Sequence, residues 1–264
     1  LAAGNLLNPQ DRYPTKIMVA VMVIMAFSAA ITLIFTKESP TEEIEGYPRR
    51  LNIKEIFKID LEVNSAYVWL IINRFIFLLG VYGLQAFAQY YIVDSLAVAN
   101  PIKATADLMA ALALALIICA FLGGWLTDRF GARRVFNLAS LMTAVGSILL
   151  ITVNKMQMLT IYGGIVGAGI GLFLVSNWAL VNRMAPSGEA GKYIGLTNLA
   201  TAGAAALGRL EGPLIDFINN SSPGKYFGYD VVFIFSAFCS LLSFFSLYRV
   251  FTRSAVNGSP PREV

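Results

Sequence analysis

The chain has 264 residues, of which 57% are hydrophobic and only 14% are charged, and its mean hydropathy is +0.66. A soluble core of this length cannot bury so much apolar surface, so the composition excludes a water-soluble globular fold and indicates that lipid surrounds the protein. The net charge is +4 and histidine is absent, which excludes the usual zinc sites, and we expect neither a metal nor a cofactor.

Seven apolar runs follow one another along the chain, each long enough to cross about 30 Å of hydrocarbon as an α-helix of about 20 residues. None alternates apolar and polar residues with the period of two that a barrel strand requires, so backbone groups must be satisfied within helices. We therefore expect an all-α integral membrane protein with seven transmembrane helices. The runs are residues 17–36, 68–93, 105–127, 135–153, 158–181, 193–218 and 230–250.

The segment between the first two runs is long, polar and charged, which predicts a cytoplasmic linker. Within it Ile53, Ile56, Phe57 and Leu61 recur at three- and four-residue spacing, which predicts a short amphipathic helix at the membrane surface. Four parts are therefore expected: residues 1–36, an extracytoplasmic segment and one helix; 37–67, the linker; 68–250, a six-helix bundle; and 251–264, a disordered cytoplasmic tail.

Lysine and arginine accumulate on the cytoplasmic side of a membrane, so their distribution predicts the orientation of the chain. If the first residues lie outside, the outer loops hold only Arg12, Lys16, Lys103, Lys155 and Lys225. The inner loops and helix ends hold the larger set Lys37, Arg49, Arg50, Lys54, Lys58, Arg74, Arg129, Arg133, Arg134, Arg183, Lys192, Arg249, Arg253 and Arg262. We expect a multi-pass protein of the plasma (cell inner) membrane with a cytoplasmic carboxy-terminus. This topology explains the sequence pI of about 9.1 without a nucleic-acid partner.

A short charged turn, residues 123–134, separates the third and fourth runs. Its spacing, Gly124-x-x-x-Asp128-Arg129-x-Gly131-x-Arg133-Arg134, resembles the loop motif of the major facilitator superfamily, whose members are membrane transporters with twelve helices in two halves. The resemblance implies a helical bundle that moves a small solute across the lipid bilayer by alternating access, and not an enzyme.

Each part of this loop motif has an expected role. Gly124 would let a neighbouring helix approach closely, and Gly131 would permit a tight turn. Asp128 would form a latch with a helix N-terminus or an arginine, and this latch would break when the two halves rock. Anionic headgroups would bind the basic residues Arg129, Arg133 and Arg134. The alternative is a cytoplasmic turn that is merely basic.

The place of the motif in the chain implies a numbering of the helices. In the superfamily the motif follows the second helix and often recurs after the eighth, whereas here it follows the third run. The runs then correspond to helices six to twelve, with a long linker between helices six and seven. By this resemblance the chain is a fragment, and its partner is the missing amino-terminal half of the same protein. The six helices after the linker would form two inverted triplets.

Polar residues inside the apolar runs are candidates for the transport pathway, because charge within a membrane is costly and usually faces a cavity. On a continuous helix in the sixth run, Asn198, Thr201, Arg209 and Asp216 share one face, while Glu211 points almost the opposite way. Arg209 would bind solute or a coupling carboxylate, or else hold two helices together as a buried pair. Pro213 predicts a bend in this run.

Two other runs carry groups that suit a hydroxylated ligand. Tyr82, Gln85 and Gln89 share a face of the second run, and Asn177 and Trp178 in the fifth run would hydrogen-bond and stack with a sugar. Ordinary helix packing is the alternative for both sets. Residues 184–198 resemble the corresponding connection of sucrose/proton and glycoside-pentoside-hexuronide cation symporters, which implies sugar uptake by symport with protons or sodium ions.

Two other functions are alternatives to a sugar symporter. An efflux pump for amphipathic compounds would have the same fold, and its antiporter signature lies on a helix that this chain lacks. A seven-helix receptor would match the helix count and the Asp128-Arg129-Phe130 sequence. The long first inner loop and the absence of both Asn-Pro-x-x-Tyr in the last run and a cysteine near Lys103 argue against the receptor.

Overall fold

The computed structural model describes residues 15–35, 64–185, 190–221 and 224–256. The chain divides into two units, residues 1–58 and 59–264. In the first unit the structure describes one helix, α2 (Thr15–Phe35), which is strongly apolar and contains neither glycine nor proline. The predicted amphipathic helix and most of the linker and tail lie outside the described residues.

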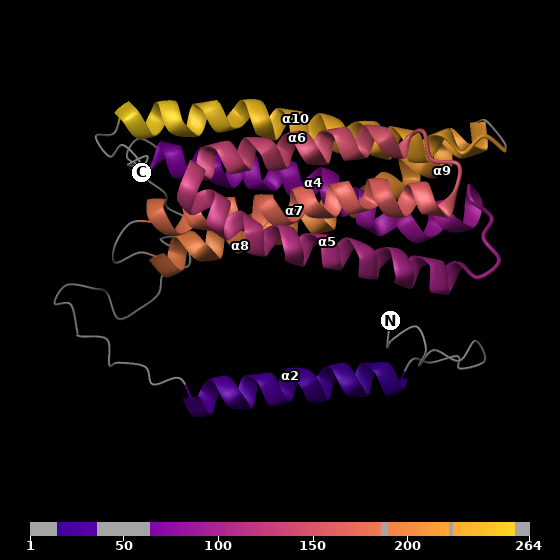
Figure 1. Cartoon of the computed structure of the whole chain (residues 1–264), viewed down its shortest axis with the longest axis horizontal. Coiled ribbons are helices and arrows are strands. Elements are labelled where there is room, and N and C mark those ends of the chain that lie inside the picture. The colour runs from indigo at the N-terminus through magenta and orange to yellow at the C-terminus, as the bar shows by residue number, and fades with distance from the viewer. Residues whose placement is uncertain (1–14, 36–63, 186–189, 222–223, 257–264) are drawn as a thin grey trace. The chain divides into compact units, whose positions relative to one another are not determined.

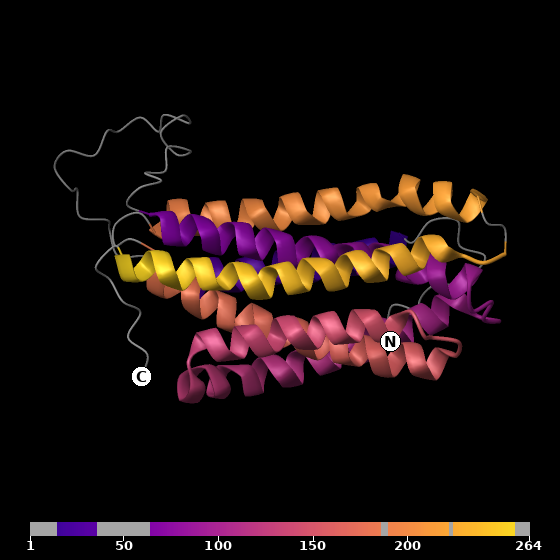
Figure 2. The ribbon, with the colours of Figure 1, turned by 90° about the horizontal axis from the view of Figure 1, so that it is seen from above.

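The regular secondary structure of the second unit is entirely helical in its described residues, which confirms the all-α prediction (Figure 1). Its long helices run side by side in two views at right angles (Figures 1 and 2). The elements are α4 (Ser65–Asp94), α5 (Pro101–Phe130), α6 (Ala132–Leu150), α7 (Met156–Met184), α8 (Ala190–Gly208), the 3₁₀ turn η1 (Arg209–Glu211), α9 (Gly212–Ser221) and α10 (Phe227–Val256).

Five of the described helices, α2, α4, α5, α7 and α10, are long and apolar enough to cross a membrane. The fourth and sixth predicted spans do not meet this criterion of length and apolar composition. Helix α6 has 19 residues and opens with Arg133 and Arg134, while α8 ends after 19 residues at a break. The sixth predicted run is therefore helical but interrupted.

The break in the sixth run lies where α8 gives way to η1 and then to α9. Pro213, near the start of α9, has no N–H to donate to the preceding turn, so a continuous α-helix cannot pass through it unperturbed. The interruption thus lies immediately before Pro213, where the sequence predicted a bend. The 3₁₀ turn changes the helical register between Asn198 and Asp216, and both residues are exposed in the described structure.

Helix α7 packs against both α5 and α6 through glycines. A Cβ atom added at Gly167 would lie 2.7 Å from the Leu112 carbonyl oxygen of α5, and one added at Gly171 would fall on the Leu116 carbonyl oxygen. Gly169 faces Thr143 of α6 in the same way. The backbone of α7 therefore lies directly on its neighbours, which fixes the position of the polar residues near its end.

The packing pattern repeats between two sets of helices. Helix α4 contacts α8 and α10, just as α7 contacts α5 and α6, and α6 contacts α10. The pattern is unchanged if α4 is exchanged with α7, α5 with the broken α8–α9 segment, and α6 with α10. Such a pattern is the one expected of two equivalent triplets.

Candidate functional site

The most unusual side chain in the second unit is Arg74, the tenth residue of α4. It lies about 14 Å along the helix from Ser65 and is only 3% exposed. On the sequence alone, Arg74 was counted with the basic residues of the cytoplasmic loops and helix ends, whereas the structure buries its side chain inside the bundle. An arginine buried within a span is costly, and such residues usually mark a functional site.

Three helices meet at the Arg74 guanidinium. Its Nε–H donates to the Thr201 Oγ1 of α8 at 2.9 Å, and its Nη1 donates to the Asn177 Oδ1 of α7. The Trp178 ring of α7 lies under the guanidinium, with 4.8 Å between the Cζ atom and the ring centroid. Arg74, Asn177, Trp178 and Thr201 are together called the Arg74 cluster below.

A second set of hydrogen bonds fixes the α8 side of the cluster. The Thr201 hydroxyl donates to the Thr197 carbonyl oxygen at 3.1 Å, so its lone pairs are left to accept from Arg74. The Tyr67 hydroxyl lies 2.8 Å from the Thr197 Oγ1 and 3.1 Å from the Tyr193 carbonyl oxygen. These contacts hold α4 and α8 in register at the cluster.

Hydrogen-bond donors outnumber acceptors in the Arg74 cluster. Each recorded hydrogen-bond partner of Arg74 is neutral, and among the described residues no carboxylate pairs with it. The Nδ2 group of Asn177 is also buried and lacks a hydrogen-bond partner among those residues. Unpaired buried donors are unfavourable, so the cluster suits a ligand rich in acceptor oxygens, above all one with a negative charge.

The neighbouring Asn73 shows what a structural polar contact looks like in this bundle. Its Nδ2 donates to the Ser243 carbonyl oxygen and to the Ser246 Oγ, both at 2.6 Å, and its Oδ1 accepts from the Ser243 Oγ at 3.0 Å. Both ends of the amide are satisfied, so this contact links α4 to α10. Arg74 differs because its donors are not matched by acceptors.

The structure brings together some of the predicted site residues and separates others. Asn177, Trp178 and Thr201 meet at Arg74, whereas Tyr82 is half-buried farther along α4. The remaining candidates are exposed in the described structure: Gln85, Gln89, Asn198, Arg209 and Asp216. Arg209 donates from Nη1 to the Ala205 carbonyl oxygen of its own helix at 3.1 Å.

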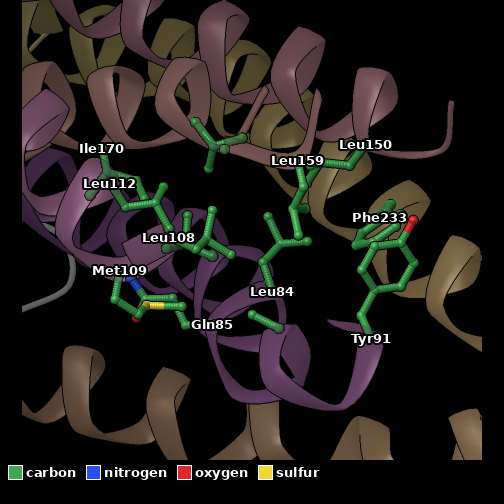
Figure 3. A pocket seen from close by; sticks show the side chains of 14 residues that line it. Leu84, Gln85, Tyr91, Leu108, Met109, Leu112, Leu150, Leu159, Ile170 and Phe233 are labelled. Carbon is green, nitrogen blue, oxygen red and sulfur yellow. The ribbon is translucent and has the colours of Figure 1, made fainter. Parts of the chain in front are cut away.

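Gln85 also lines a small cavity between α4, α5, α6, α7 and α10 (Figure 3). Gln85 and Met109 lie at one end of it, and Tyr91 and Phe233, whose ring centroids are 5.2 Å apart, lie at the other (Figure 3). The cavity volume is about 50 Å³. Since one water needs roughly 10–15 Å³ on this measure, the cavity has room for a few waters and not for a sugar.

The loop motif forms the turn between α5 and α6. Gly131 has φ +85°, which confirms the tight turn predicted there. A Cβ added at Gly124 would meet nothing within 4 Å among the described residues, so the close approach predicted there stays a prediction. At the neighbouring Gly123 a Cβ would lie 3.1 Å from the Leu172 side chain of α7.

The charged residues of the motif lie at the surface of this unit. Asp128 is exposed and has no ion pair with a described residue, so the predicted latch stays a prediction. Arg129 lies 5.2 Å from the Trp125 ring centroid, and Arg133 lies 5.1 Å from that of Phe251 of α10. Arg134 is exposed.

Glu211, in the turn η1, is a further candidate, although the sequence predicted it on the face opposite Arg209. Both of its carboxylate oxygens are buried and lack a hydrogen-bond partner among the described residues. They lie against the backbone of α4, because a Cβ added at Gly83 would fall on the carboxylate. The sequence did contain a signal for both residues. Glu211 is a carboxyl group within an apolar run, and Arg74 is an arginine within another.

Comparison with family models decides the class of this protein. The model of the Major Facilitator Superfamily matches residues 11–208 and, in a second alignment, residues 70–264. The chain belongs to the major facilitator superfamily. It is therefore an integral, multi-pass membrane protein of a transporter family and not an enzyme. No curated protein matches the sequence.

Solved structures share the fold. A bacterial homologue of the human drug peptide transporters PepT1 and PepT2 has a TM-score of 0.67 at 20% identity, over 76% of this chain and 45% of that one. Tetrameric PepTSo2 has a TM-score of 0.66 at 19% identity, over 74% of this chain and 42% of that one. The chain thus spans less than half the length of either protein. Neither is described as a sugar symporter, so the predicted likeness to sugar symporters gains no support from them.

Proposed function

We propose that the full-length protein is a secondary active transporter that moves a small, sugar-like solute by alternating access, coupled to a cation. The observation that carries the proposal is the Arg74 cluster, a buried cation whose recorded hydrogen-bond partners are neutral and beside which an amide donor is left unpaired. In this proposal residues 68–250 are the carboxy-terminal half, helices seven to twelve, and the solute lies between this half and the amino-terminal half.

The chemistry of the cluster matches an oxygen-rich solute. Hydroxyl and ring oxygens of a sugar can accept from the guanidinium and from the Asn177 amide, while an apolar face of the sugar stacks on Trp178. A carboxylate on the solute would in addition neutralise Arg74. We therefore expect an acidic sugar such as D-glucuronate to bind more tightly than D-glucose.

The proposal retains the expected membrane topology and the predicted gate. The protein would lie in the plasma (cell inner) membrane with its carboxy-terminus in the cytoplasm, and the turn that carries Asp128 would contact the other half. Arg209 and Asp216, exposed in the described structure, would also face that half. Under this view the carboxy-terminal half supplies Arg74 and its partners, and the amino-terminal half completes the binding site.

Uptake by the purified full-length protein in proteoliposomes tests this function. We expect Arg74→Gln to lose uptake of D-glucuronate, because it removes charge-assisted hydrogen bonds worth about 1.5–3 kcal/mol each, or roughly 10- to 150-fold in affinity. Arg249→Gln is the matched control, since this exposed arginine of α10 also lies over a tryptophan, Trp69, at 5.0 Å. Equal uptake by Arg74→Gln and the wild type would refute the site.

A panel of solutes tests the substrate class in the same vesicles. Preferred uptake of dialanine over D-glucuronate and D-glucose would refute the sugar-like solute while leaving the transporter class intact. Export of a lipophilic cation in place of sugar uptake would instead identify an efflux pump for amphipathic compounds, the alternative that the sequence left open.

A further inference from the structure

The buried carboxyl of Glu211 lies where α8 and α4 approach each other closely. A Cβ added at Gly208, the last residue of α8, would lie 3.0 Å from the Gly83 backbone nitrogen of α4, and one added at Gly83 would fall on the Glu211 carboxylate. The two glycines therefore allow the turn η1 to rest on α4. Figure 2 shows α4, the broken α8–α9 segment and α10 running side by side.

The surroundings of Glu211 contain no compensating charge among the described residues. Glu211 lines a cavity of about 300 Å³ whose other lining residues are Leu79, Leu207, Leu210, Leu214, Val231, Val232 and Phe235. The ionisable group that α10 places nearby is the Cys239 thiol, which faces Gly80 of α4. Arg209, in the same turn as Glu211, donates to the Ala205 carbonyl oxygen, and Asp216 of α9 is exposed.

An ionised carboxylate is strongly unfavourable in such a place. It has lost its hydration, and no described donor replaces the lost water. The group becomes neutral if it takes up a proton. A sodium ion would instead need several oxygen ligands, whereas the residues lining this cavity are otherwise apolar and no described group of three acidic, cysteine or histidine residues can hold a metal ion.

We propose that Glu211 is the binding site of the coupling cation and that this cation is a proton. The inference rests on the proposed transport function and adds the identity of the ion and the residue that carries it. Glu211 lies at the break that ends α8, and Thr201 of the same helix holds Arg74. Gly83 and Arg74 are nine residues apart on α4, about 14 Å. Proton binding at Glu211 thus acts on α4 and α8, two of the three helices that hold the Arg74 cluster.

Two measurements distinguish a loss of proton coupling from a loss of solute binding: solute exchange, and accumulation of solute against its gradient. In proteoliposomes that contain the full-length protein, we expect Glu211→Gln to retain counterflow of D-glucuronate, because the Arg74 cluster is intact, and to lose accumulation driven by a proton gradient. The matched control is Asp107→Asn, which removes an exposed carboxylate on α5 and is expected to retain both activities. Proton-driven accumulation by Glu211→Gln at the wild-type level, or wild-type accumulation driven by sodium alone, would overturn the proposal.

Infrared difference spectroscopy tests the same residue without any solute. Between acidic and alkaline pH, the wild type is expected to show the carbonyl band of a protonated carboxyl group, and Glu211→Gln is expected to lose it while Asp107→Asn keeps it. A band that is unchanged in Glu211→Gln would overturn the inference. Failure of Arg74→Gln to affect uptake would instead refute the solute site and would leave the infrared result for Glu211 unchanged.

Discussion

The close packing of α7 on α5 gives a sharp prediction at Gly171. A Cβ at this position would fall on the Leu116 carbonyl oxygen and lie 3.0 Å from the Ala120 nitrogen, both of which are backbone atoms. No side-chain rotation can relieve such an overlap, so Gly171→Ala must push the two helices apart. Overpacking of this kind costs about 1–3 kcal/mol.

The control for this substitution lies two turns away on the same helix. A Cβ at Gly164 would meet nothing within 4 Å among the described residues. Both substitutions gain up to about 1 kcal/mol of helix propensity, which cancels when they are compared. The free energies of unfolding should therefore differ by about 1–3 kcal/mol.

Thermal unfolding of the purified full-length protein in detergent measures this difference, and Gly171→Ala is expected to unfold at the lower temperature. Its uptake of D-glucuronate should also fall, because α7 carries Asn177 six residues later and the helix would move away from Arg74. If Gly171→Ala were as stable as Gly164→Ala, the backbone contact between α5 and α7 would be refuted.

Two further substitutions test the proposed coupling and gating. Gly83→Ala places a Cβ on the Glu211 carboxylate and displaces it, so proton-driven accumulation should be lost, while Gly195→Ala, which has open space in α8, should retain it. Wild-type accumulation by Gly83→Ala would contradict the position of the carboxylate. Asp128→Asn should shift the balance between inward- and outward-open states, as measured by the accessibility of introduced cysteines, and unchanged accessibility would refute the latch.

Local chemistry was sufficient to predict much of the fold. The apolar runs predicted the helices, and a glycine in a short polar turn predicted the positive φ at Gly131. Pro213 marked the place of the helix break, because its missing N–H acts within one turn of the same helix. Asn177 and Trp178 were found because amide and indole groups inside an apolar run need partners.

The central residue of the site was missed because its partners are distant in the sequence. Arg74 is held by Asn177 and Thr201, more than a hundred residues away, whereas counting basic residues treats an arginine near the end of a run as a marker of topology. Glu211 was predicted on the face opposite Arg209, and in the structure Arg209 is exposed whereas the Glu211 carboxyl is buried. Its burial against α4 was not predicted, because Gly83 of α4 is distant from it in the sequence.

Direct binding of D-glucuronate to the purified full-length protein tests the central claim that Arg74 binds the solute. The comparison is between Arg74→Gln and Arg209→Gln, because both arginines lie in predicted spans but only Arg74 is buried at the junction of three helices. We predict that Arg74→Gln weakens binding by roughly 10- to 150-fold and that Arg209→Gln has a smaller effect. Undiminished binding by Arg74→Gln, with binding lost in Arg209→Gln, would contradict the account.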